Sequence, residues 1–177
     1  MTKYIYLVGS SIVKQWSNIS DVSNKKIFNF GVSGFLTKSM LYKKYLKNLN
    51  IVNKSIIYPE YLIYYCGNND LLHNINPNIV IKHIKTFLLY TQEMFEYKTK
   101  IVYLSLLRSP KKILQGYDEL IDYINYHILL FCKLHNIIFV ELNFLLNDRS
   151  DFVKDGVHLS NIGYNKVNNL LKIKKIF

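Results

Sequence analysis

The segment Tyr-Ile-Tyr-Leu-Val-Gly-Ser-Ser-Ile, residues 4–12, joins an unbroken apolar run to a glycine and two serines. The run Tyr4–Val8 lacks polar alternation and is rich in side chains that favour strands, which predicts a strand buried on both faces. Glycine and serine at the end of a strand often begin a helix, so we expect a short helix over Ser10–Trp16. A strand of this kind indicates a parallel sheet with helices on both sides.

Four further segments resemble this strand in composition: Lys26–Phe30, Tyr61–Tyr65, Lys100–Leu106 and Ile137–Leu142. Helical spacing or capping signals occur over Thr37–Leu49, from Asn76-Pro77 to Phe95, over Asp118–Leu134 and from Ser160 to Leu171. Five strands joined by helices predict an α/β fold, a three-layer α/β/α sandwich with a five-stranded parallel sheet. No linker-like stretch or repeat divides the chain, so we expect residues 1–177 to form a single domain.

The chain carries 23 Lys and Arg against 12 Asp and Glu, a formal net charge of +11. Such a balance raises the question of nucleic acid or an anionic membrane as a partner. Only Arg108 and Arg149 are arginines, and the lysines are scattered without a run longer than two. We therefore interpret the charge as a solvated surface and expect neither a nucleic-acid nor a membrane partner.

Cys66 and Cys132 are the only cysteines and lie in apolar stretches, which favours buried, reduced thiols over a metal site or a disulfide framework. No apolar stretch approaches the roughly 20 residues of a membrane span. The run Tyr4–Val8 is too short for the core of a signal peptide. The expected location is therefore the cytoplasm.

Ligands of an open parallel sheet bind beyond the carboxyl ends of its strands. Four segments are predicted at that edge: Gly9-Ser10-Ser11-Ile12, Asn29-Phe30-Gly31-Val32-Ser33-Gly34, Gly67-Asn68-Asn69-Asp70 and, before the last helix, Asp155-Gly156-Val157-His158. Together they hold a hydroxyl, an imidazole, a carboxylate, a side-chain amide and two glycine-rich turns, which is the inventory for acyl transfer. Each segment alone is typical of a helix cap or a turn, but their joint occurrence favours a site.

These segments resemble, in order, the sequence blocks of the SGNH (GDSL-like) hydrolases. Gly-Ser-Ser-Ile resembles the first block, Gly-Asp-Ser, and Asn-Phe-Gly-Val-Ser-Gly resembles the second. Gly-Asn-Asn-Asp resembles the third block, Gly-x-Asn-Asp, and Asp-Gly-Val-His-Leu resembles the Asp-x-x-His block. The second block and Leu106-Leu107 look most like the platelet-activating-factor acetylhydrolase-like branch. The resemblance extends from Gly9 to Tyr164 and implies a flavodoxin-like SGNH hydrolase fold.

The resemblance also implies a catalytic triad of Ser11, Asp155 and His158 and an oxyanion hole built from Ser11, Gly34 and Asn69. A serine hydroxyl is a poor nucleophile and needs a base within hydrogen-bond reach. Histidine titrates near neutral pH, and a carboxylate three residues earlier can hold its tautomer and stabilise the imidazolium. The backbone N–H groups of Ser11 and Gly34 and the side-chain amide of Asn69 would donate to the oxyanion. No metal or cofactor is expected.

Two positions depart from the family pattern. Ser10 stands where an aspartate usually precedes the nucleophile, and Phe35 stands where Asp or Asn usually follows the second-block glycine. We expect Phe35 to make the mouth of the pocket more apolar and to contact the substrate. Arg108, just after the fourth predicted strand, is a second candidate contact, for a substrate carboxylate or phosphate. A solvated loop position is an equal alternative for Arg108.

The sequence thus predicts a metal-free serine esterase that hydrolyses small acyl esters through an acyl-enzyme on Ser11. An O-acetyl group on a carbohydrate is the favoured substrate by family analogy. An O-acyltransferase with the same triad is one alternative, because only the acceptor differs. A catalytically silent binding module on the same fold is another, and a nucleic-acid binder is the least favoured.

Overall fold

The computed structural model describes residues 3–17, 25–52, 55–56 and 58–177. Its centre is a five-stranded sheet in the order β2-β1-β5-β6-β7, and every neighbouring pair of strands is parallel. The strands are β1 (Lys3–Gly9), β2 (Lys25–Gly31), β5 (Tyr61–Tyr65), β6 (Lys100–Leu104) and β7 (Ile138–Val140). The chain leaves β1 for the edge strand β2 and returns to β5 on the other side of β1. The topological switch point, where open sheets bind ligands, therefore lies at the carboxyl ends of β1 and β5.

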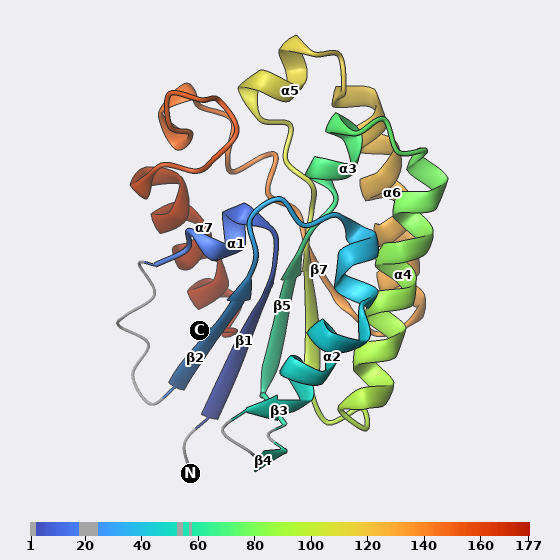
Figure 1. Cartoon of the computed structure of the whole chain (residues 1–177). Helices are drawn as coiled ribbons and strands as arrows, with labels where there is room; N and C mark the ends of the chain where they lie inside the picture. The colour runs from blue at the N-terminus through green and yellow to red at the C-terminus, as the bar shows by residue number, and fades with distance from the viewer. Residues whose placement is uncertain (1–2, 18–24, 53–54, 57) are drawn as a thin grey trace.

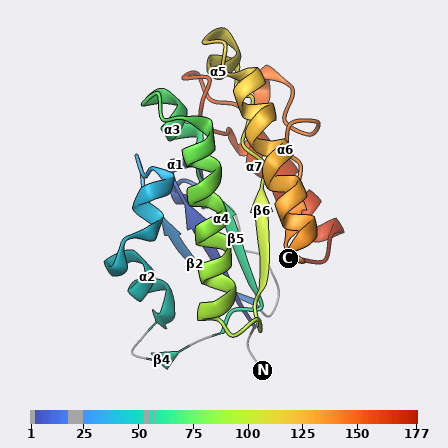
Figure 2. The ribbon, with the colours of Figure 1, turned by 90° about the vertical axis from the view of Figure 1, so that its right-hand side faces the viewer.

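Helices cover both faces of this sheet. Helices α1 (Ser11–Lys14) and α7 (Asn161–Ile173) lie on one face, and α4 (Pro77–Met94) and α6 (Asp118–Leu134) lie side by side on the other (Figure 1, Figure 2). The α/β/α sandwich with a five-stranded parallel sheet, predicted from the sequence, is confirmed.

Shorter elements complete the fold at the two ends of the sheet. At the carboxyl end lie α3 (Asn68–Leu72) and α5 (Pro110–Leu114), and the hairpin of β3 (Ile51–Val52) and β4 (Ser55–Ile56) lies at the opposite end (Figure 1). The remaining elements are the 3-10 helices η1 (Thr37–Leu41) and η2 (Arg149–Asp151) and helix α2 (Lys43–Asn50).

Some predicted boundaries were wrong. The single helix expected over Thr37–Leu49 is divided at Tyr42, whose extended backbone (φ −69°, ψ 132°) separates η1 from α2. The strand expected over Lys100–Leu106 ends at Leu104, and the one over Ile137–Leu142 is confined to Ile138–Val140.

The reason for the shorter strands is that side chains replace the ladder partners. The amide of Asn125 bonds both backbone groups of Leu106, at 2.8 and 2.9 Å, and the hydroxyl of Ser105 accepts from the N–H of Leu142 at 2.9 Å. A side chain can thus satisfy a buried backbone group where the neighbouring strand has ended.

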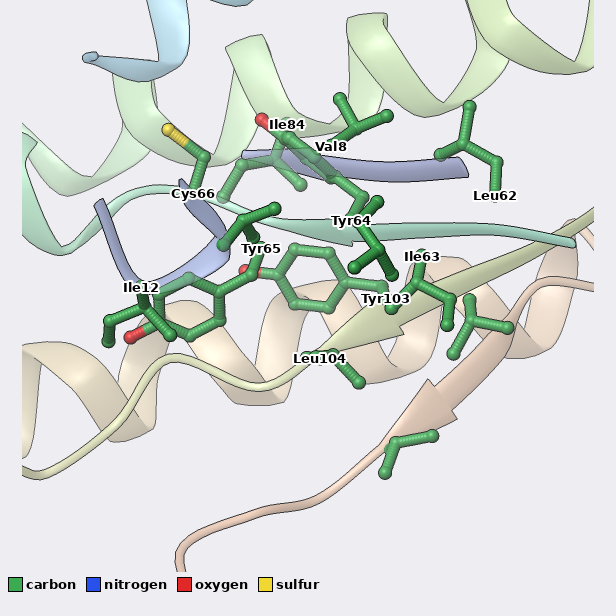
Figure 3. Packing of buried hydrophobic residues seen from close by; sticks show 14 of the residues in the cluster. Val8, Ile12, Leu62, Ile63, Tyr64, Tyr65, Cys66, Ile84, Tyr103 and Leu104 are labelled. Carbon is green, nitrogen blue, oxygen red and sulfur yellow. The ribbon is translucent and has the colours of Figure 1, made fainter. Parts of the chain in front are cut away.

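The core is built around the central strands, and aromatic residues fill much of it (Figure 3). All five residues of β5 are buried. The ring of Tyr64 packs against Phe87 of α4, with centroids 4.4 Å apart. Cys66 and Cys132 are buried free thiols, as the sequence predicts. This tightly filled interior fixes the ends of β1 and β5, from which the candidate site is built.

Candidate active site

Ser11 lies at the switch point because of the turn that precedes it. A Cβ atom on Gly9 would collide with the carbonyl oxygen of Tyr65, so only glycine lets β1 end this close to β5. The N–H of Ser10 then donates to that carbonyl at 3.2 Å, and α1 begins at Ser11. The hydroxyl of Tyr164 on α7 donates to the carbonyl of Ile12 at 2.7 Å, which ties α1 to α7.

The structure brings Ser11, His158 and Asp155 into one hydrogen-bonded chain. Nε2 of His158 lies 2.9 Å from Oγ of Ser11, and Nδ1 of His158 lies 2.6 Å from Oδ2 of Asp155. Because the carboxylate can only accept, the hydrogen of the neutral imidazole sits on Nδ1 and Nε2 is free to accept the serine proton. This arrangement can activate a serine hydroxyl as a nucleophile.

The Asp155 carboxylate is held by its own turn. Its Oδ1 accepts from the backbone N–H groups of Val157, at 2.8 Å, and His158, at 3.0 Å. Partial burial raises the pKa of this carboxyl, but the hydrogen bonds from His158 and Val157 outweigh burial and lower the pKa to about 2. Asp155 is therefore ionised at neutral pH, which is the state that orients an imidazole.

The segment before Asp155 is braced by groups that the sequence did not single out for this role. The guanidinium of Arg149 donates to the carbonyls of Val153, at 2.9 Å, and Lys154, at 3.0 Å. The buried carboxylate of Asp151 pairs with Lys166 of α7 at 2.8 Å. Arg149 could not be assigned because its partners are backbone carbonyls, which leave no motif in the sequence.

Gly34 and Asn69 reach the same end of the sheet from β2 and β5. Gly34 has φ +76°, a conformation that favours glycine, and it is exposed. One hydrogen of the Asn69 side-chain amide is donated to the carbonyl of Phe35 at 3.0 Å. That bond fixes the amide and leaves its second hydrogen available. The N–H of Ser11, in the first turn of α1, has no partner within the helix.

A buried network ties the Gly34 loop to the Asn69 turn. The carboxylate of Asp70 accepts from the backbone N–H of Thr37, at 3.0 Å, and from its hydroxyl, at 2.6 Å. Since that hydroxyl gives its hydrogen to Asp70, the contact at 3.1 Å between Thr37 Oγ1 and His83 Nδ1 requires the hydrogen to be on Nδ1. Burial raises the pKa of Asp70 in spite of these bonds, and burial lowers the pKa of His83.

Thr37→Val is expected to lower the free energy of unfolding by about 1–3 kcal/mol, because it removes the hydroxyl that donates to the buried Asp70 carboxylate and that contacts Nδ1 of His83, and leaves Asp70 only the backbone N–H of residue 37. Urea unfolding followed by circular dichroism measures this change. Thr37→Ser should recover part of the loss, and Thr86→Val, at an exposed threonine of α4, should change stability by less than about 0.5 kcal/mol. Equal stability of Thr37→Val and Thr86→Val would contradict a stabilising role for the Asp70–Thr37–His83 network.

Phe35 and Arg108 engage other residues of the chain. The Phe35 ring is half-buried and packs edge-on against Tyr45, with centroids 5.4 Å apart. The guanidinium of Arg108 pairs with Asp122 at 3.4 Å and lines a surface cavity of about 740 Å³ between α5 and the segment after β7. The triad residues do not line this cavity. Substrate contact by Phe35 and Arg108 stays a prediction.

Within the described parts of the chain, no group of three or more His, Cys, Asp and Glu side chains is arranged to hold a metal ion. Nor does any described helix have the length and apolar character needed to cross a membrane.

The parallel sheet with a serine, a histidine and a carboxylate at its switch point has the architecture of the SGNH hydrolases. The family model of the GDSL-like lipase/acylhydrolases matches residues 6–171 of this chain. The chain belongs to this family and is an SGNH-type esterase. A search of curated proteins finds no match.

Solved structures share the fold at low sequence identity. A member of the lipolytic G-D-S-L family from Veillonella parvula is 19% identical, with a TM-score of 0.77 and 96% of each chain covered. A Streptococcus pneumoniae protein named for platelet activating factor is 22% identical, with a TM-score of 0.74 and coverage of 98% of this chain and 84% of that one.

An acetyl-xylooligosaccharide esterase variant from Geobacillus also matches, at 13% identity and a TM-score of 0.73, with 96% of this chain and 93% of that chain covered. These three similarities establish the flavodoxin-like SGNH fold that the sequence resemblance predicts.

Proposed function

We propose that this esterase hydrolyses small acyl esters, O-acetyl groups on carbohydrate in particular, through a covalent acyl-enzyme on Ser11. The observation that carries the proposal is the hydrogen-bonded chain in which His158 lies 2.9 Å from Ser11 and 2.6 Å from Asp155. Both distances fall within the range that proton transfer and orientation require.

In the acylation step, Oγ of Ser11 attacks the ester carbonyl carbon while Nε2 of His158 accepts the hydroxyl proton. Asp155 stabilises the imidazolium that forms. The carbonyl oxygen becomes an oxyanion in a tetrahedral intermediate. When that intermediate collapses, the bond to the alcohol oxygen breaks and His158 protonates the leaving alcohol.

We propose three donors for the oxyanion, all carried by segments that follow the carboxyl ends of strands. They are the N–H groups of Ser11 and Gly34 and the free amide hydrogen of Asn69. The bond from Asn69 to the Phe35 carbonyl supports this role, because a preorganised donor does not need to reorient during the reaction.

Deacylation repeats the same steps with water. His158 takes a proton from water, the oxygen attacks the acyl carbon, and collapse of the second intermediate returns the proton to Ser11 Oγ. The products are a carboxylic acid, an alcohol and the free enzyme.

Two features support a small acyl group. Asp155, Ser33 and Gly34 are exposed, so the site opens directly to solvent. The cavity of about 740 Å³ is lined by none of Ser11, Asp155 and His158, so it does not supply a binding space for a long acyl chain directly at the nucleophile. The name of the Geobacillus neighbour, an acetyl-xylooligosaccharide esterase, supports a carbohydrate as the alcohol by analogy.

A panel of nitrophenyl esters and acetylated oligosaccharides tests the substrate class. We expect kcat/KM for nitrophenyl acetate to exceed that for the octanoate by about tenfold or more, since a small acyl site penalises added methylenes. Acetate should be released from an acetylated xylo-oligosaccharide.

A preference for the octanoate would contradict the small acyl group. Faster transfer of acetyl to an added alcohol than to water would identify an O-acyltransferase instead. The first result is read from the ratio of kcat/KM values, and the second from chromatography of the products with and without the acceptor.

A further inference from the structure

Lys112 of α5 is a lysine that the chain buries without an acidic partner. Its side chain is 0% exposed, and no described carboxylate forms an ion pair with it. Its Nζ donates to the backbone carbonyl of Asn68 at 3.0 Å and lies 5.0 Å from the centre of the Tyr117 ring. Lysine is almost never fully buried unpaired, because removing an ammonium group from water is costly. A buried, perturbed cation beside a reaction centre is a candidate functional group.

Helix α5 contacts both halves of the active site. Lys112 holds the carbonyl of Asn68, whose peptide bond leads directly into Asn69. The backbone N–H of the preceding residue, Lys111, donates to the carbonyl of Gly156 at 3.0 Å. Gly156 lies inside the turn that carries Asp155 and His158. Two successive residues of one short helix therefore hold a carbonyl on each side of the reaction centre.

We propose that Lys112 is a positioning residue of this esterase, which sets the Asn69 amide relative to the Asp155–His158 turn and supplies a positive charge behind the oxyanion hole. The inference rests on the proposed function and deepens it by assigning a role to a residue outside the triad. Because Lys112 is fully buried, it acts through Asn68 and not through contact with the substrate. A buried positive charge behind the site favours a transition state that gains negative charge.

The charge of Lys112 depends on pH within a measurable range. Burial, and to a smaller extent the charge of Lys111, lowers the pKa of Lys112 to about 8. The ionisable side chains on the segments bonded to α5 include Tyr117, whose ring lies 5.0 Å from Nζ of Lys112, and Asp70, which is bonded to Thr37. They also include Asp155 and His158, which are bonded to each other. Above pH 8 the amine is neutral, so it donates more weakly and no longer favours the oxyanion.

The experiment compares Lys112→Met with wild type and with Lys133→Met, a control at an exposed lysine of α6. Lys112→Met should lower kcat for nitrophenyl acetate about ten- to a hundredfold, a smaller loss than removal of an oxyanion donor, with KM nearly unchanged. The thermal midpoint should change little, because losing an unpaired buried charge offsets the lost hydrogen bond. Lys133→Met should match wild type.

The pH profile separates positioning from a merely structural role. Wild-type kcat should fall on the alkaline side with a midpoint near pH 8, while circular dichroism stays constant, and Lys112→Met should lack this fall. Equal kcat of Lys112→Met and wild type would overturn the inference and leave the triad intact. If Lys112→Met does not fold, the wild-type profile decides: constant kcat from pH 8 to 10 would overturn the inference. Wild-type protein without any esterase activity would instead contradict the proposed function itself.

Discussion

His158→Ala is expected to lower kcat by about 10⁴- to 10⁶-fold, a loss comparable to that of Ser11→Ala. The imidazole makes the 2.9 Å contact with Ser11 and the 2.6 Å contact with Asp155, so its removal leaves the serine without a base. Steady-state hydrolysis of a nitrophenyl ester, with circular dichroism as a check on folding, measures the loss. His127→Ala is the matched control, because that ring packs against Tyr123 on α6.

The triad also predicts that losses do not multiply. Ser11→Ala and His158→Ala together should cost little more than either one alone, since each removes the same activated nucleophile. Asp155→Asn should be severe but less complete, because it spoils the orientation of the ring and keeps the base. Independent, multiplying losses, or substantial activity in His158→Ala, would mean that another group is the base.

Asn69→Ala is expected to lower kcat by about 10²- to 10³-fold and to leave KM nearly unchanged. Its free amide hydrogen serves an oxyanion that exists only in the transition state, so ground-state binding does not depend on it. The same kinetic assay, run over a range of ester concentrations, separates the two parameters. Asn165→Ala, at an exposed asparagine of α7, is the control. Normal kcat in Asn69→Ala would remove this residue from the oxyanion hole.

The sequence predicts the sheet well because its strands are buried on both faces. Every residue of Tyr61–Tyr65 is buried, and such a stretch appears in the sequence as an unbroken apolar run. The candidate triad could also be predicted from the sequence, because parallel strands and the turn before the last helix bring motif residues to one edge of the sheet. Asp155 and His158 are three residues apart, so a local turn suffices to join them.

Other features depend on contacts that leave no local signal. Lys112 bonds a carbonyl 44 residues away, and Thr37 bonds a carboxylate 33 residues away. Neither pairing produces a motif, since a backbone carbonyl or a turn threonine occurs throughout any chain. Asn69 and Asp70, which taken alone are typical of a turn, lie in the short helix α3, which begins at Asn68 directly after Gly67 with its φ of +138°.

Covalent labelling tests most directly whether Ser11 is the nucleophile. A fluorophosphonate probe should add one group to the wild-type protein, and peptide mapping should locate it on Ser11, because Nε2 of His158 lies 2.9 Å from that hydroxyl. Ser11→Ala should take no label, and His158→Ala should take it far more slowly. A label on Ser10, or an active wild-type protein that takes no label, would contradict the assignment of Ser11 as the nucleophile.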